Sequence, residues 1–349
     1  MAVYYIGADV HCNNTELAVE HNGAIVQRHS VATTVRAIRE VLDALDGRKH
    51  LAMEEGPLAG WLYRNLVDHV DSLVVCDPRR NKWIASEGDK DDRIDATKLA
   101  GLLRGNYLRA VHHSREERMV RLKRWVYLYE DRVREATRTI NKVRACARQY
   151  GVRVPGRALH DSQARKEWFA SLACADLATQ LRLLFKGYDV TVQQVRQARG
   201  QLSRQGRAFE VVGHWRELPG MGLIRSVTLL AYLDTPWRFK KKTRLWKYCG
   251  VGLQRATSGQ DAHGREHPAQ VELAWPVNLR IKNVVIGATI SAIHSRENGF
   301  RQFYERMLGD GTLTSNARHA VARKLLTVLW GMWKSCSRFD AELCWSDQA

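Results

Sequence analysis

The sequence predicts an α/β N-terminal domain, a central coiled coil and a mainly α C-terminal domain. Three observations predict this order. Short apolar runs alternate with turn residues in the first third of the chain, an apolar heptad pattern starts at Met119, and helical periodicity prevails over residues 211–349. We therefore expect domains over residues 1–112, 113–210 and 211–349.

The N-terminal domain alternates strand-like and helix-like segments. Strands are expected over residues 3–9, 15–21, 24–31, 51–55 and 73–77, and helices over 34–45, 58–70 and 92–104. Turn residues such as Asn13-Asn14 and Asn22-Gly23 separate the first three strands. The resulting order, β-β-β-α-β-α-β-α, is that of an RNase H-like α/β domain.

Apolar residues then recur at alternating spacings of three and four. They are Met119, Leu122, Val126, Tyr129, Val133, Ala136, Ile140, Val143, Ala147 and Tyr150. This seam predicts a long coiled-coil helix, which Gly151 and Pro155 end. A second helical stretch over residues 172–208 is expected to pack back antiparallel on it. The seam fits both a dimerisation interface and closure within one chain.

Basic residues are concentrated in the C-terminal two thirds of the chain, which has 349 residues and a formal net charge of +18. Residues 1–110 contain 14 Lys and Arg against 16 Asp and Glu, so residues 111–349 contain 41 against 21. Such asymmetry indicates a polyanionic partner for the C-terminal part. We expect nucleic acid rather than membrane. The sequence has neither a separate basic amphipathic helix with an aromatic apolar face nor an apolar run of about 18 residues.

The cysteines favour a reducing compartment. All seven are scattered along the chain, and no CxxC pair suggests zinc. Residues 1–12 enter a strand-like pattern directly, without the features of a signal peptide. We therefore expect free thiols and a cytoplasmic location, with association to the nucleoid during activity.

Carboxylates occur where predicted strands end and a predicted helix starts. Asp9 ends the first strand, and Glu54 and Glu55 end the strand over residues 51–55. Asp92 and Asp95 share one face at the start of a helix. Clustered carboxylates require a neutralising cation. Mg²⁺ suits oxygen ligands and phosphodiester cleavage, and Mn²⁺ is an alternative.

Each of these carboxylates also fits an ordinary structural role. Asp9 suits a turn, Asp92 suits a helix N-cap, and Asp95 suits the positive end of a helix dipole. Their order within an RNase H-like pattern favours the metal site. A strand that leaves the core at Met53 favours Glu54 as the ligand, and Glu55 is the alternative.

Two features of the C-terminal region suit a nucleic-acid backbone. Leu218-Pro219-Gly220-Met221-Gly222 precedes a helical run and resembles a helix-hairpin-helix turn, which exposes backbone N–H groups to phosphate. A basic cluster with aromatic residues follows at Trp237–Lys242; it fits contact with the backbone and stacking, and equally an aromatic pair that anchors a solvated basic loop to the core. The candidate nucleic-acid contacts are Pro219, Gly220, Gly222, Arg225, Arg238, Lys240, Lys241, Lys242, Arg255, Gly259, Arg280 and Lys282.

Ser258 lies in a polar loop, VGLQRATSGQDAHG. By composition alone it is an ordinary loop serine. No Gly-x-Ser-x-Gly elbow accompanies it, so the sequence does not indicate a serine hydrolase.

Six ordered motifs, spread over nearly the whole chain, carry a resemblance to a known family. They are YIGAD, MEEGPLAGWLY, VVCDPRRNKWIASEGDKDDRIDATKLA, LPGMGLIRSVTLLAYLD, YCGVGLQRATSG and ARHAVARKLLTVLWGMWKS. The chain resembles the DEDD transposases of insertion sequences. These are bridge-RNA-guided serine recombinases, similar to the Piv-type DNA invertases.

The resemblance implies a RuvC-like N-terminal domain, a coiled coil used for dimerisation and a C-terminal transposase domain. It places an acidic tetrad at Asp9, Glu54, Asp92 and Asp95, and a nucleophilic serine at Ser258. The family's glutamate is usually followed by a small residue and then glycine. Here Glu54-Glu55-Gly56 stands instead, so the choice between the two glutamates stays open.

The implied reaction is strand exchange in DNA through a covalent phosphoserine, assisted by Mg²⁺ at the acidic tetrad. The implied partners are the element ends, the target DNA, a non-coding guide RNA and further copies of the chain, as a dimer or tetramer. One alternative is an RNase H-like nuclease that uses water as nucleophile. A second is a non-catalytic nucleic-acid-binding scaffold.

Overall fold

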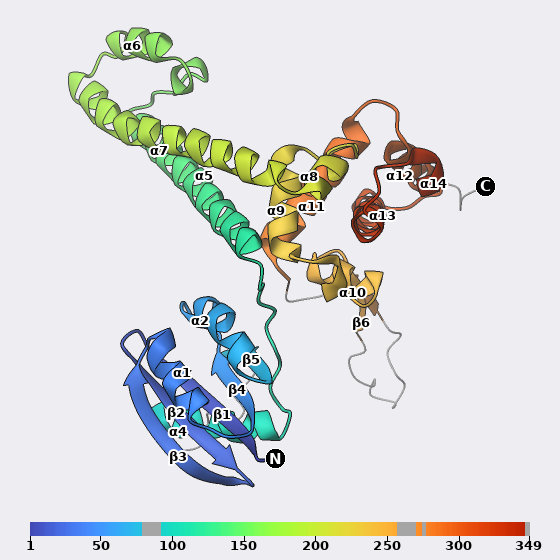
Figure 1. Ribbon diagram of the computed structural model, residues 1–349. Coiled ribbons are helices and arrows are strands. Elements are labelled where there is room, and N and C mark those ends of the chain that lie inside the picture. The colour runs from blue at the N-terminus through green and yellow to red at the C-terminus, as the bar shows by residue number, and fades with distance from the viewer. Residues whose placement is uncertain (79–91, 257–269, 274–276, 346–349) are drawn as a thin grey trace, which may run out of the picture. The chain divides into compact units, whose positions relative to one another are not determined.

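The computed structural model describes residues 1–78, 92–256, 270–273 and 277–345. It forms two compact units, Met1–Glu117 and Arg118–Ala349 (Figure 1). Within the described part, no helix combines the length and the apolar composition that crossing a bilayer requires.

The first unit is built on a mixed five-stranded sheet of order β3-β2-β1-β4-β5. The strands are β1 Val3–Val10, β2 Asn14–His21, β3 Ala24–Ala32, β4 Arg48–Glu54 and β5 Ser72–Cys76. The first three run antiparallel, and β4 and β5 run parallel to β1. Asn22 and Gly23 both adopt positive φ between β2 and β3, as a tight hairpin turn requires. The predicted strand and helix order is confirmed, and it is consistent with an RNase H-like domain.

One face of this sheet carries the apolar core. Ile6 and Ala8 of β1, with Leu51 and Met53 of β4, are buried there. The helices on this side are α1 Val35–Asp43, α2 Ala59–Leu66 and the short η1 Val67–His69. Helix α1 starts at Val35 because the Thr34 hydroxyl accepts a hydrogen bond from Ala37 N, a standard N-cap.

The opposite face is covered by α4 Asp92–Arg104. Small residues permit a close approach: a Cβ added to Gly7 would lie 2.0 Å from the Ala96 carbonyl oxygen and 2.7 Å from Ala100 N. The buried Ala18 and Ala52 flank Gly7 in register on β2 and β4. A bulky residue on this face of β1 would therefore displace the helix.

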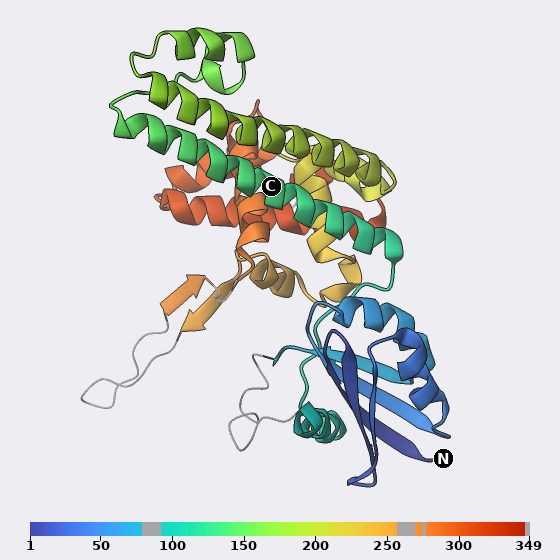
Figure 2. The same ribbon diagram turned by 90° about the vertical axis from the view of Figure 1, so that its left-hand side faces the viewer.

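The second unit begins with a long helical hairpin of α5 Glu117–Gln149 and α7 Ala175–Arg207, joined by η2 Arg157–Leu159 and α6 Ser162–Ala170. The pair is antiparallel (Figure 2), since Arg132 of α5 bonds Gln194 while Cys146 bonds Gln180. The predicted long helix and its antiparallel partner are both present. The hairpin belongs to the same unit as residues 211–349.

The apolar seam of α5 serves two different cores. Met119, Leu122 and Val126 join the C-terminal core, whereas Ile140 and Val143 pack with Phe169, Phe185 and other residues at the tip of the hairpin. Between the two cores the seam opens, and Val133 is exposed; so is Tyr150 at its end. The predicted seam is thus not buried along its whole length.

The C-terminal region is mainly helical, as predicted. Its elements are α8 Glu210–Trp215, α9 Leu223–Leu233, η3 Pro236–Arg238, α10 Lys242–Tyr248, β6 Leu253–Ala256, β7 Gln270–Leu273, α11 Leu279–His294, α12 Gly299–Gly309, α13 Thr314–Ser335 and α14 Ala341–Trp345. Trp215 is fully buried at the centre of this core, and its Nε1 donates to the Leu329 carbonyl at 3.0 Å. The only sheet among the described residues of this unit is the β6–β7 pair.

Candidate functional site

Asp9 and Glu54 lie at the same edge of the first sheet and on the same face. Gly7 of β1 and Ala52 of β4 are direct partners in the parallel register. Asp9 lies two residues after Gly7, and Glu54 lies two residues after Ala52. Side chains two residues apart in a strand point to the same face of the sheet. This is the face that α4 covers, because the Gly7 Cα lies against Ala96 and Ala100. The two carboxylates therefore emerge together at the carboxyl ends of neighbouring strands.

Helix α4 runs antiparallel to β1, so its start lies toward Asp9. Near its C-terminal end, Arg104 pairs with Glu20, which is the partner of Tyr5 in the sheet. One to two turns earlier, Ala96 and Ala100 lie against Gly7. The first turn of α4, with Asp92 and Asp95, lies one further turn toward the N-terminus of the helix. This places it near the level of Asp9 along β1.

The acidic residues are only partly described. Asp95 is exposed, and the Asp92 side chain lies outside the described part. Among the described side chains, no three His, Cys, Asp or Glu residues stand close enough to hold a metal ion. Carboxylate oxygens are nevertheless the ligands that a divalent cation such as Mg²⁺ takes, so the chemistry of Asp9 and Glu54 at the two strand ends suits such an ion.

Glu55 is turned to the other side. By the alternation of the strand it faces away from α4, and its Oε2 lies 2.6 Å from His113 Nε2. The His113 ring packs 5.5 Å from the ring of Tyr63 on α2. Glu55 thus belongs to the α2 side of the sheet.

His11 is a neighbour of the carboxylates that the sequence reasoning missed. Its Nε2 lies 3.0 Å from Asp9 Oδ2. The available signal was the spacing of two residues, which places both side chains on one face where β1 ends.

In the second unit, the Leu218–Gly222 turn joins α8 to α9, as a helix-hairpin-helix element requires. Gly220 has φ +82°, and a Cβ there would lie 2.1 Å from the Ala288 carbonyl oxygen of α11. Gly220 is therefore needed for helix packing. Gly222 is exposed, a Cβ added to it would meet no described heavy atom within 4 Å, and it precedes α9, which has no side-chain cap. Pro219 is half-buried beside it.

Three of the predicted nucleic-acid contacts are arginines with internal partners. Arg225 donates to the Gly220 carbonyl at 2.6 Å and to Ser291 Oγ at 2.9 Å. Arg238 donates to the Tyr232 carbonyl and to Tyr248 Oη. Arg280 pairs with Glu130 at 3.1 Å.

Arg280 and Glu130 also form a network with a buried tyrosine. Tyr232 Oη donates to Glu130 Oε2 at 2.9 Å and accepts from Arg280 Nη1 at 3.1 Å. Burial raises the pKa of Tyr232 well above its usual value, although the Arg280 hydrogen bond opposes the shift. These groups tie α5, α9 and α11 together.

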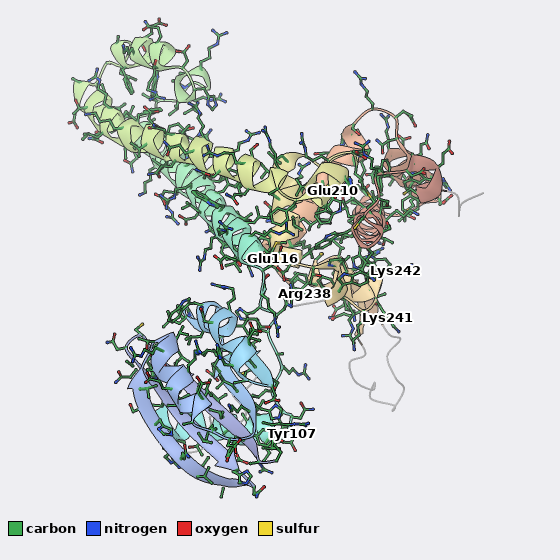
Figure 3. The ribbon with its side chains drawn as sticks, in the orientation of Figure 1. Tyr107, Glu116, Glu210, Arg238, Lys241 and Lys242 are labelled. Atoms are coloured by element: carbon green, nitrogen blue, oxygen red, sulfur yellow. The ribbon has the colours of Figure 1, made fainter. Side chains whose placement is uncertain are left out.

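The predicted lysines are more open. Lys240 is exposed, as are Lys241 and Lys242 at the start of α10 (Figure 3). Lys282 is half-buried with its side chain against Gly250. Arg255 lies in β6, but its side chain lies outside the described part. Ser258 and Gly259 also lie outside the described residues.

Strands β6 and β7 lie before and after Ser258 in the chain. Strands β6 and β7 pair antiparallel up to Ala256 and Gln270, so the chain leaves and re-enters one small hairpin. Just before β6, the Val251 carbonyl accepts a hydrogen bond from Arg323 Nη1 at 3.2 Å. Lys247 and Lys282 pack against Gly252 and Gly250 at the same place. Arg323 thus bonds the backbone just before β6, and Lys247 and Lys282 lie close to the two glycines there.

Comparison with known proteins identifies the family. Residues 6–152 match a DEDD family model described as a transposase, and residues 214–305 match the model of the transposase IS116/IS110/IS902 family. Comparison with curated proteins finds no match. The two models follow each other in the order expected for one enzyme and together cover more than half of the chain. The chain therefore belongs to the IS110 family of transposases, which catalyse DNA strand transfer.

Proposed function

We propose that this transposase exchanges DNA strands through a covalent phosphoserine at Ser258, with the acidic residues Asp9, Glu54, Asp92 and Asp95 as a metal-binding tetrad. The observation that carries the proposal is the shared face of Asp9 and Glu54, toward which the start of α4 runs. This arrangement at the end of a mixed sheet is the one a RuvC-like domain uses. When bound, Mg²⁺ would neutralise the phosphate and favour the ionised form of an attacking hydroxyl.

The residues of the chain account for the rest of the reaction. Ser258 Oγ forms a bond to phosphorus, the phosphodiester bond to one deoxyribose oxygen breaks, and the serine proton leaves with that oxygen. A hydroxyl end of the second duplex then attacks the phosphoserine and releases Ser258. Each step replaces one phosphoester by another, so strand exchange needs no external energy source. Strands β6 and β7, which precede and follow residues 257–269 in the chain, pair with each other.

We also propose that a non-coding RNA selects the DNA, with the protein binding backbone and shape. Residues 111–349 contain 41 basic and 21 acidic residues, a net charge of +20, which supports a polyanionic partner such as nucleic acid. The exposed Lys240, Lys241 and Lys242 supply a surface for it. Gly222 and the uncapped start of α9 supply backbone N–H groups for a phosphate.

A denaturing gel for a covalent protein–DNA adduct tests this function. The reaction contains Mg²⁺, element-end DNA and RNA co-purified from the native locus, with wild type beside Ser258→Ala and Asp9→Asn. We expect an adduct in wild type alone. Strand cleavage without an adduct, equal in wild type and Ser258→Ala, would instead support the RNase H-like nuclease. Binding that is indifferent to Mg²⁺ and accompanied by no cleavage would support the scaffold.

A further inference from the structure

Trp237 is a large aromatic side chain that the fold holds at the surface. It is 70% exposed, although its neighbours in the chain Pro236 and Phe239 are buried. The backbone at this point is fixed. Trp237 N donates to Thr235 Oγ1, and the Pro236 carbonyl accepts from Trp330 Nε1 at 2.9 Å. The indole therefore projects from a rigid 3₁₀ turn, η3.

A lysine supports this indole from α13. Lys334 Nζ lies 5.2 Å from the ring centre of Trp237 and 3.7 Å from that of Trp330. The ammonium is thus within cation–π range of both indoles, which stabilises it and favours one orientation of the outer ring. No other described aromatic ring stacks on Trp237. The exposed surface of the ring remains available to a ligand.

The surroundings of Trp237 are strongly basic. Residues 234–247 contain six Lys and Arg against the single Asp234. Lys240, Lys241, Lys242 and Arg244 are all exposed, and Figure 3 shows Lys241 and Lys242, where α10 begins. An exposed aromatic ring beside exposed positive charge suits a planar ligand that carries phosphates. Two copies of this surface would repel each other, which argues against self-association through it.

We propose that Trp237 is the stacking platform for an unpaired nucleobase, and that Lys240, Lys241 and Lys242 bind the phosphates that flank it. Both faces of a base inside a duplex are covered by its neighbours, so only an unpaired or terminal base offers a face to the indole. The inference depends on the nucleic-acid partner of the proposed function, but not on the chemistry of Ser258.

The test measures binding by the full-length protein. Fluorescence anisotropy with a labelled 15-nucleotide oligo(dT) and a 15-base-pair duplex is compared for wild type, Trp237→Ala and Trp237→Phe at one salt concentration. We expect Trp237→Ala to weaken binding of the single strand about tenfold, the loss of one base stack. Trp237→Phe should recover most of it, and duplex affinity should change less than about twofold. Tyr107→Ala is the matched control, because Tyr107 is 75% exposed but lies in the first unit.

Several outcomes would overturn the inference. Unchanged affinity of Trp237→Ala for oligo(dT) would show that Trp237 does not stack on a base. An equal loss of affinity for the single strand and the duplex would show that Trp237 only positions the basic residues and does not stack on a base. A change of oligomeric state in light scattering, with unchanged affinity, would assign Trp237 to a protein interface. Thermal unfolding of each variant excludes loss of the fold. A wild type that binds both probes but forms no adduct would refute the Ser258 chemistry alone.

Discussion

Single residues of the same type play different parts in this molecule, and their partners distinguish them. Arg225, Arg238 and Arg280 stand in a basic region, yet each donates to groups of its own unit. Lys241 and Lys242 are exposed beside them. Arginine offers several donors in a planar group, which suits the bridging of carbonyls and hydroxyls, whereas lysine keeps a mobile point charge for phosphate. Net charge alone does not separate these two uses.

Single substitutions can distinguish whether Glu54 or Glu55 is the metal ligand. Glu54→Gln should reduce strand cleavage in Mg²⁺ by more than about 100-fold, because it neutralises a side chain on the face that α4 covers. Glu55→Gln should leave most of the activity, since Glu55 faces His113 on the other side of the sheet. Cleavage rates of both variants at saturating DNA measure the difference, and circular dichroism checks folding. Loss of activity in Glu55→Gln with activity retained in Glu54→Gln would reverse the assignment.

Among the elements, the contact of α4 with β1 positions the acidic residues. Gly7→Ala should lower the free energy of unfolding of the first unit by about 1–3 kcal/mol, because the new Cβ would lie 2.0 Å from the Ala96 carbonyl oxygen. It should also slow cleavage by moving the start of α4. Gly56→Ala is the matched control, since a Cβ there meets no described heavy atom within 4 Å. Urea unfolding of the two variants makes the comparison, and equal stability would contradict the close packing.

The element order could be predicted from the sequence because it depends on local signals. Asn22-Gly23 marks a turn, and the apolar spacing from Met119 marks a helix, whatever the rest of the chain does. The burial of that helix could not be predicted. Its seam passes from one core at Val126 to another at Ile140, and Val133 between them is exposed because the partner helix does not cover it.

The candidate site could be predicted only in part, for a similar reason. The strand-end positions of Asp9 and Glu54 follow from the apolar pattern, but the face they share follows from pairing between β1 and β4. Gly220 shows the limit most clearly. Its motif predicts contact with phosphate, which stays a prediction, and the structure adds a packing role against Ala288 of α11, a residue distant in sequence.

At the scale of the whole molecule, the helical hairpin leaves apolar surface on its outer side. Leu183 is 64% exposed and Val190 is 53% exposed, and these residues are seven apart on α7. That spacing places them on one face, as in the seam of a coiled coil. We therefore expect a second copy of the chain to pack on this face of α7, whereas most of the α5 seam packs within the chain.

The double change Leu183→Glu and Val190→Glu should convert the dimer into a monomer, because it would place charges in an apolar seam. Light scattering over a range of protein concentrations measures the oligomeric state. Since both residues are exposed in the single chain, the helix content should stay unchanged. A dimer that survives both changes would place the contact elsewhere. If the monomer still binds DNA but forms no adduct, strand exchange requires two copies of the chain.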